Sequence, residues 1–184
     1  RKVIAIEKDP RAIRILQDLL SVAGESLELI EGDARGYPIW NLESRPRKII
    51  ANRPYNVATN LFLSWLEHSS AFESMTLMFQ REVAERLVAK TGCSEYGRLS
   101  VLTQFLADSE ILFDVPATAF VPPPKVTSSL VKIIPLPTPR YTCNQRTLEL
   151  ITSLAFGQRR KMLRGSLKSI GGEFLLQRAN IDPK

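Results

Sequence analysis

Three strand-length runs in the first third of the chain each lead into a polar residue, and this pattern restricts the fold more than any other. The runs span residues 3–6, 27–30 and 48–51, and the polar residues after them are Glu7, Asp33 and Asn52. Helix-length or loop-length connections separate the runs, as in a parallel sheet with right-handed crossovers. The sequence therefore predicts an open α/β sheet that binds its ligands at the carboxyl ends of the strands.

Later segments extend this sheet. Asp9-Pro10 is typical of a helix start and predicts a helix over residues 11–22. Further strands are expected at residues 74–79, 110–115 and 129–134, and further helices at 61–66, 83–89 and 96–106. Thr59 or Asn60 is expected to cap the helix at 61–66. The last two strands are joined by a stiff proline-rich linker, so we expect them to form the antiparallel edge of a mixed sheet.

The C-terminal quarter has a different character. Three prolines within residues 135–139 predict a hinge. Beyond it the pattern is helical, with helices expected at residues 148–156, 160–170 and 173–179. We therefore predict an α/β domain over residues 1–137 and a small all-helical domain over residues 138–184.

The composition is that of a soluble cytoplasmic protein. Hydrophobic residues make up 44% of the chain, which suffices for a sizeable core, but no apolar run is long enough to span a membrane. Cys93 and Cys143 are isolated and are expected to be reduced thiols rather than a disulfide or metal ligands. With His68 as the single histidine, we expect neither a metal site nor Ser-His-Asp catalysis.

The charge pattern points to a polyanionic partner. The formal net charge is +6, although an excess of this size also serves solubility. A cluster of cations lies in the predicted helix near the C-terminus: Arg159, Arg160, Lys161, Arg164 and Lys168. Such a cluster can bind RNA phosphates, and a solvated helix face is the alternative.

The residues at the strand ends suit a nucleoside cofactor. A carboxylate such as Glu7 can accept hydrogen bonds from both hydroxyls of a ribose. Asp33 can accept from the exocyclic amine of an adenine, while the backbone N–H of Ala34 reaches a ring nitrogen. A single Asp after a strand is more often a helix cap, so the interpretation depends on the order of all three strand-end residues.

The third strand leads into the tetrapeptide Asn52-Arg53-Pro54-Tyr55. An amide oxygen and a free backbone carbonyl can accept from the two N–H groups of an exocyclic amine, and an adjacent ring can stack on its base. Adenine N6 is a poor nucleophile because its lone pair is delocalised, so such a grip would favour a reactive, pyramidal nitrogen. An ordinary turn explains the Asn and Pro but leaves the Tyr unexplained.

The tetrapeptide and six further segments resemble the ribosomal RNA small-subunit adenine-N6 dimethyltransferases. The segments are residues 6–9 (IEKD), 31–34 (EGDA), 51–56 (ANRPYN), 80–86 (QREVAER), 96–100 (YGRLS), 120–126 (FVPPPKV) and 156–161 (FGQRRK). They follow the order of the family over almost the whole chain. The resemblance implies a Rossmann-like class I methyltransferase sheet followed by a small helical RNA-binding domain.

The resemblance also implies an activity. It is the N6,N6-dimethylation of adenines in small-subunit ribosomal RNA, with S-adenosylmethionine as methyl donor and a role in small-subunit maturation. Glu7 would bind the ribose of the donor and Asp33 its adenine. Lys8, Ala34 and Asn52 would complete the donor-binding set. The expected partner is small-subunit ribosomal RNA or the assembling particle, and the protein is expected to be a cytoplasmic monomer.

The target adenine would be held by Asn52, Pro54, Tyr55 and Phe120. Asn52 and the Pro54 carbonyl would grip N6, while Tyr55 and Phe120 would stack on the flipped base. For Phe120, a packed aromatic plug before the proline run is an equal alternative. The residues implied in RNA binding are Arg53, Arg159, Arg160, Lys161 and Arg164.

Two departures from the family pattern are visible. Arg53 stands where the family usually has an apolar residue. The glycine-rich loop that follows the first strand of the family would have to precede Arg1, so the cofactor pocket is expected to be incomplete and the sheet to lack its first strand. These departures motivate the alternative function, a non-catalytic RNA-binding or ribosome assembly factor on a methyltransferase scaffold.

Overall fold

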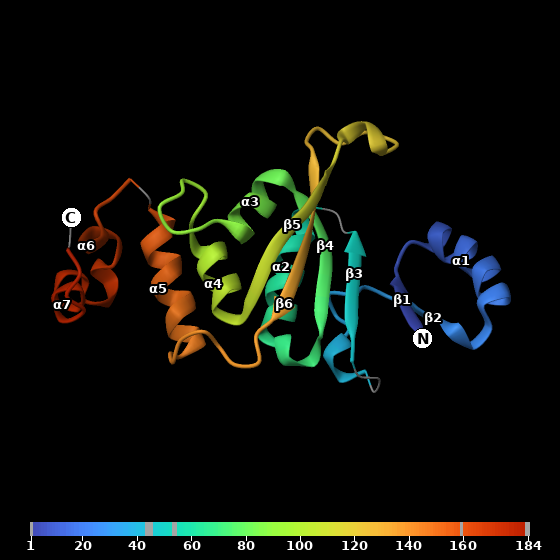
Figure 1. The fold of residues 1–184 in the computed structure, drawn as a ribbon, viewed down its shortest axis with the longest axis horizontal. Helices are drawn as coiled ribbons and strands as arrows, with labels where there is room; N and C mark the ends of the chain where they lie inside the picture. Colours follow the sequence, from blue (N-terminus) through green and yellow to red (C-terminus); the bar gives the residue numbers. More distant parts are fainter. Residues whose placement is uncertain (1, 43–45, 53–54, 159, 183–184) are drawn as a thin grey trace. The chain divides into compact units, whose positions relative to one another are not determined.

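The computed structural model describes residues 2–42, 46–52, 55–158 and 160–182. It consists of two compact units, Arg1–Ser44 and Arg45–Lys184, each with its own β-sheet (Figure 1).

The first unit is a strand–helix–strand arrangement. Strand β1 (Val3–Glu7) pairs in parallel with β2 (Leu27–Glu31), and Glu7 stands opposite Glu31 in the register. Helix α1 (Pro10–Ala23) and the 3-10 turn η1 (Gly24–Ser26) connect them, and η2 (Ile39–Asn41) follows. Asp9 caps α1 by accepting from the N–H of Arg11, which confirms the predicted helix start.

The second unit contains a mixed four-stranded sheet in the order β3-β4-β6-β5. Its strands are β3 (Lys48–Asn52), β4 (Ser74–Gln80), β5 (Ala107–Val115) and β6 (Ser128–Pro135). Strand β4 is parallel to β3, while β6 is antiparallel to both β4 and β5. The predicted antiparallel edge is therefore confirmed, and β6 lies between β4 and β5.

Helices pack on this sheet through a compact apolar core. Helix α2 (Tyr55–Glu67) contributes Phe62, whose ring is fully buried and meets the ring of Phe79 on β4 edge to face, with centroids 5.9 Å apart. The turn η3 (Ser69–Ala71) follows α2, and helices α3 (Arg81–Val88) and α4 (Arg98–Leu106) lie between β4 and β5 in the chain. Leu87 of α3 and Met75 of β4 are fully buried.

Helix α2 begins earlier than the sequence predicts. The helix starts at Tyr55, so Thr59 lies inside it and the expected cap at Thr59 or Asn60 is wrong. A loop role for the proline at position 54 does not predict this start. A proline lacks the N–H that a helix start leaves unbonded and has a helix-compatible φ, so Asn-x-Pro also favours the opening of a helix.

The C-terminal segment is helical but more broken than predicted. Its elements are α5 (Gln145–Gly157), α6 (Leu163–Ser166), η5 (Lys168–Ile170) and α7 (Gly172–Arg178). The single helix predicted over residues 160–170 is therefore wrong. The stretch of residues 158–161 has no apolar side chain to bury, and propensity alone rarely sustains a short helix.

Helix α5 packs on the α/β part of the second unit. The rings of Tyr96, just before α4, and Phe156 of α5 meet edge to face with centroids 6.2 Å apart. The division into functional domains at residues 137 and 138 stays a prediction. Among the described residues, every helix is too short or too polar to cross a membrane.

Candidate functional site

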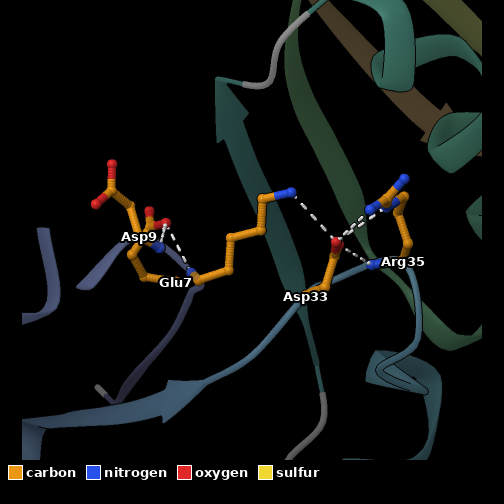
Figure 2. Close-up of polar contacts among 5 residues, drawn as sticks. Glu7, Asp9, Asp33 and Arg35 are labelled. Carbon is orange, nitrogen blue, oxygen red and sulfur yellow. Dashed lines mark hydrogen bonds and ion pairs between the residues drawn. The ribbon is translucent and has the colours of Figure 1, made fainter. Parts of the chain in front are cut away.

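Glu7 closes β1 with its carboxylate already held by the backbone. Its Oε1 accepts from the N–H groups of Lys8 at 2.7 Å and Asp9 at 2.8 Å (Figure 2). Its carbonyl accepts from the N–H of Gly32 at 2.9 Å. These bonds fix the carboxyl group at the end of the strand. Among the described residues, only Oε1 is engaged, so Oε2 remains available to a ligand.

Asp33 lies two residues beyond β2 and carries a dense set of donors (Figure 2). Its Oδ1 accepts from the N–H of Arg35 at 3.0 Å, and its Oδ2 accepts from Nε and Nη2 of Arg35 at 3.0 and 2.6 Å. Lys8 reaches the same Oδ2 with its Nζ at 3.3 Å. Three of these four donors converge on Oδ2, whereas Oδ1 accepts from one, so an acceptor position remains on Oδ1.

The same donors control the ionisation of Asp33. The side-chain hydrogen bonds from Arg35, then its backbone N–H and the Lys8 ammonium, hold the pKa of the Asp33 carboxyl well below its usual range, against an opposing effect of burial. Asp9 shows the same arrangement after β1. There the Arg11 side chain and N–H lower the pKa of Asp9 to about 2.

Arg35→Gln is expected to raise the pKa of Asp33 toward the ordinary value of about 3.9. A depressed native pKa stabilises the fold above the unfolded-state pKa, and this contribution is lost as the pH falls through the native pKa. The Arg35 side chain is 58% exposed, so we expect a small, salt-screened contribution to stability. Carbon-13 NMR titration of the Asp33 carboxyl measures the shift.

Arg11→Gln is the matched control for this titration, because it removes the equivalent partner of Asp9. It should raise the pKa of Asp9 and leave that of Asp33 unchanged. An Asp33 pKa that stays low in Arg35→Gln would contradict the assignment of the shift to Arg35.

Ala34, which is also predicted to bind the cofactor, is 5% exposed. The predicted contact through its N–H stays a prediction. The structure brings Lys8 and Asp33 together directly, and Glu7 is held by the N–H of Lys8, so three predicted cofactor residues cluster at the ends of β1 and β2.

In the second unit, Asn52 is the last residue of β3 and is exposed. It stands opposite Met78 of the parallel strand β4, so β3 and β4 end at one edge of the sheet, here called the carboxyl edge. The loop of residues 116–127, here called the Phe120 loop, leaves β5 and enters β6 at the same edge (Figure 1). Asn52 and the Phe120 loop therefore share this edge, while the predicted meeting of Asn52 with Glu7 and Asp33 stays a prediction.

The Phe120 loop exposes most of its length. It contains η4 (Ala117–Ala119), a half-buried Phe120 and a fully exposed Val121. Tyr55, the last residue of the tetrapeptide, is the first residue of helix α2, and Arg53 and Pro54 lie outside the described residues. The roles of these residues toward a target base stay predictions.

The predicted RNA-binding cations occupy different places from those expected. Arg160 and Lys161 lie in the turn after α5, where the N–H of Lys161 donates to the carbonyl of Gln158 at 2.8 Å. Arg164 lies on α6, and Arg159 is outside the described residues. The cluster is therefore not one continuous helix face, and its contact with RNA stays a prediction.

Sequence reasoning missed Arg35. A signal for it was present, because Asp9-Pro10-Arg11 after β1 and Asp33-Ala34-Arg35 after β2 share the spacing Asp-x-Arg. At both places the Asp accepts from the N–H of the Arg, and the guanidinium returns to the same carboxylate. The repeated spacing after two parallel strands is the pattern that could have revealed these ion pairs.

The sequence matches known proteins over its whole length. A profile of the family described as ribosomal RNA adenine dimethylase matches residues 1–183. Ribosomal RNA small subunit methyltransferase A from Rhodospirillum rubrum is 52% identical over 184 residues, covering 100% of this chain and 64% of that protein. The protein of the same name from Chelativorans sp. is 51% identical over 187 residues, covering 99% and 68%. The chain thus spans about two thirds of the length of these relatives.

Two solved structures share the fold. A dimethyladenosine transferase from Plasmodium falciparum superposes with a TM-score of 0.78 at 28% identity, over 100% of this chain and 68% of that one. The 23S rRNA methyltransferase ErmE gives a TM-score of 0.67 at 24% identity, over 100% and 74%, which bears on the fold alone. The predicted Rossmann-like methyltransferase fold is confirmed. By the profile match and the shared identity with its relatives, the chain belongs to the ribosomal RNA adenine dimethylase family.

Proposed function

We propose that the full-length protein transfers methyl groups from S-adenosylmethionine to N6 of adenines in small-subunit ribosomal RNA, two to each adenine. Family membership supports the reaction class, and the names of the curated relatives point to the small-subunit RNA. The observation that carries the proposal is that residues suited to this reaction lie at the carboxyl ends of strands in each unit. They are Glu7 and Asp33 in the first unit, and Asn52 with the Phe120 loop in the second.

The residues present fit a nucleoside cofactor. The Glu7 carboxylate is held by two backbone N–H groups and keeps Oε2 available, as a ribose diol requires. When bound, S-adenosylmethionine supplies an electrophilic methyl group on a sulfonium. The task of this chain is then to orient that group and to exclude water around it.

Asp33 fits the adenine of the cofactor through the acceptor position that remains on Oδ1. A contact to Oδ2, which already carries three donors, requires one of them to leave. The Lys8 ammonium, at 3.3 Å, makes the longest of the four contacts and its side chain is 56% exposed, so it can move into water at small cost. We therefore assign to Lys8 the role of a displaceable partner of Asp33.

The target base is assigned to the carboxyl edge of the second unit. The Asn52 side-chain oxygen and the Pro54 carbonyl accept from N6 and favour a nitrogen whose lone pair points at the methyl group. Tyr55 and Phe120 stack on the base, which offsets the few kcal/mol that extrusion from the RNA costs. No general base is required, because the proton can leave after the new bond has formed.

The basic residues are assigned to the RNA backbone. Arg53, Arg160, Lys161 and Arg164, together with Arg159, neutralise phosphates of small-subunit RNA or of the assembling particle. The net charge of +6 supports this role. Binding should weaken steeply with salt, as for any protein that releases counterions from nucleic acid. The protein is proposed to act as a monomer in the cytoplasm.

Glu7→Gln is expected to weaken S-adenosylmethionine binding by about tenfold, since a hydrogen bond to a charged acceptor contributes roughly 1.5–3 kcal/mol, about twice a neutral one. Glutamine keeps an oxygen that can accept from the N–H groups of Lys8 and Asp9, so the local fold should persist. Calorimetry on the full-length protein measures the affinity. Glu31→Gln, opposite Glu7 in the register but with no assigned role, is the control and should leave the affinity unchanged.

The decisive test of function is methyl transfer from labelled S-adenosylmethionine to small subunits isolated from methyl-deficient ribosomes, using the full-length protein. Incorporation into adenines as N6,N6-dimethyladenine is the expected result. Tight, salt-dependent RNA binding with neither incorporation nor heat on titration with S-adenosylmethionine would instead establish the alternative, a non-catalytic assembly factor.

A further inference from the structure

The Phe120 loop has little support of its own. Its twelve residues hold two internal backbone bonds among the described residues, from Ala119 to Pro116 at 3.0 Å and from Phe120 to Ala117 at 3.2 Å. The prolines at 122–124 stiffen the loop internally, but with so few bonds and so much exposed surface the loop can move as a whole about its ends. Whatever keeps Phe120 at a defined place must therefore act at the two ends of the loop.

Both ends of the loop are tied to one residue, Arg81. Arg81 is the first residue of α3, immediately after β4. Its backbone N–H, which the helix itself cannot use, donates to the carbonyl of Thr127 at 3.0 Å, at the end of the loop. Its Nη1 lies 3.2 Å from Oδ2 of Asp114, one residue from the end of β5 and so beside the start of the loop.

The two anchors belong to one connected network. The hydroxyl of Ser129, which is fully buried on β6, donates to Oδ1 of Asp114 at 2.6 Å. Ser129 also stands opposite both Asp114 of β5 and Phe79 of β4 in the registers. On its other side Arg81 donates through Nε to Oε1 of Glu85 at 2.9 Å, which fixes its guanidinium.

This network contributes geometry more than stability. The side chains of Arg81 and Asp114 are 57% and 40% exposed, and ion pairs of such exposure add little to the free energy of unfolding. Yet the pair joins the stems of the loop to the end of β4, whose neighbour β3 ends in Asn52. We propose that Arg81 is a positioning residue that holds the Phe120 loop at the carboxyl edge, so that Phe120 meets the adenine gripped by Asn52. The proposal rests on the proposed function for its catalytic consequence.

The first experiment compares Arg81→Gln with Arg86→Gln in the full-length protein. Arg86 lies on the same helix, pairs with Glu82 four residues away, and is 50% exposed, which makes it a matched control. Arg81→Gln should lower kcat for methyl transfer by about ten- to a hundredfold, the cost of a misplaced catalytic group, with KM for S-adenosylmethionine within about twofold. Arg86→Gln should leave kcat unchanged, and Arg81→Lys, which can still pair with Asp114, should recover most of the rate.

A double variant tests whether Arg81 acts through Phe120. If it does, Arg81→Gln combined with Phe120→Ala should be no slower than Phe120→Ala alone, within about twofold. Losses that multiply would overturn the proposal, because they would show that Arg81 affects the reaction by another route.

Hydrogen exchange provides a readout that does not depend on activity. In Arg81→Gln, the amides of Ala119 and Phe120 should exchange about tenfold faster, while the amides of α3 keep their rates. Unchanged exchange in the loop would overturn the proposal whether or not the protein methylates RNA. If exchange is faster in Arg81→Gln and the unaltered full-length protein transfers no methyl group, the anchor is confirmed and the proposed function is rejected.

Discussion

Replacing Asn52 by alanine is expected to slow methyl transfer by about 10²- to 10³-fold, while RNA affinity changes by less than about twofold. The reason is that the side-chain oxygen of Asn52 is proposed to accept from N6 as the nitrogen becomes pyramidal, an interaction that strengthens only in the transition state. A contact of that kind affects kcat rather than binding. Single-turnover transfer and filter binding, each with the full-length protein, measure the two quantities.

The position of Asn52 makes this test clean. The residue is exposed at the end of β3, so its replacement should change the free energy of unfolding by less than about 0.5 kcal/mol. Lys48→Ala is the control, because Lys48 is exposed at the other end of the same strand and pairs with Glu73 at 2.9 Å. It should transfer methyl groups at the unaltered rate. Equal losses of rate and affinity in Asn52→Ala would mean that Asn52 shapes the structure instead of gripping N6.

Replacing Phe62 by alanine is expected to destabilise the protein by about 3–5 kcal/mol, the usual cost of truncating a buried aromatic. Phe62 is fully buried on α2 and packs edge to face against Phe79 of β4. Its loss leaves a cavity between the helix and the sheet. Since a typical domain is stable by about 5–15 kcal/mol, urea denaturation should show a large fall in the midpoint with an unchanged slope.

Phe174→Ala provides the comparison for Phe62. Phe174 lies on α7, is 63% exposed and has Arg178 over its ring at 5.7 Å, so its truncation should cost less than about 1 kcal/mol. A similarly small loss in Phe62→Ala would show that α2 does not present this ring to the core.

Patterns that depend on neighbouring residues predicted much of the fold. The apolar runs that end in Glu7 and Asn52 are strands, and the Asp9-Pro10 pair does open a helix. The antiparallel edge was also predictable, because strand-length runs joined by a stiff linker must return along the sheet. In each case the local period and the flanking polar residue agree with the tertiary structure.

The errors arose where packing or charge pairing overrides local pattern. Leu163 begins a short helix within a segment predicted as one longer helix, because the cationic residues before it offer nothing to bury. Arg81 was not assigned a site role, because its partner is set by the reach of its side chain and not by a local spacing. For Arg81 that partner, Asp114, is thirty-three positions away in the sequence, a separation at which no periodicity operates.

The place of β6 within its sheet also has a consequence for biosynthesis. Strands β4 and β5 do not pair with each other, and each pairs with β6, the last strand of this sheet along the part of the chain that the structure describes. A nascent chain that has not reached residue 128 therefore exposes an unpaired edge on β4, and such edges favour aggregation. The sheet closes only when the strand that follows the Phe120 loop arrives, so the carboxyl edge with Asn52 and Phe120 is among the last parts of this sheet to be completed.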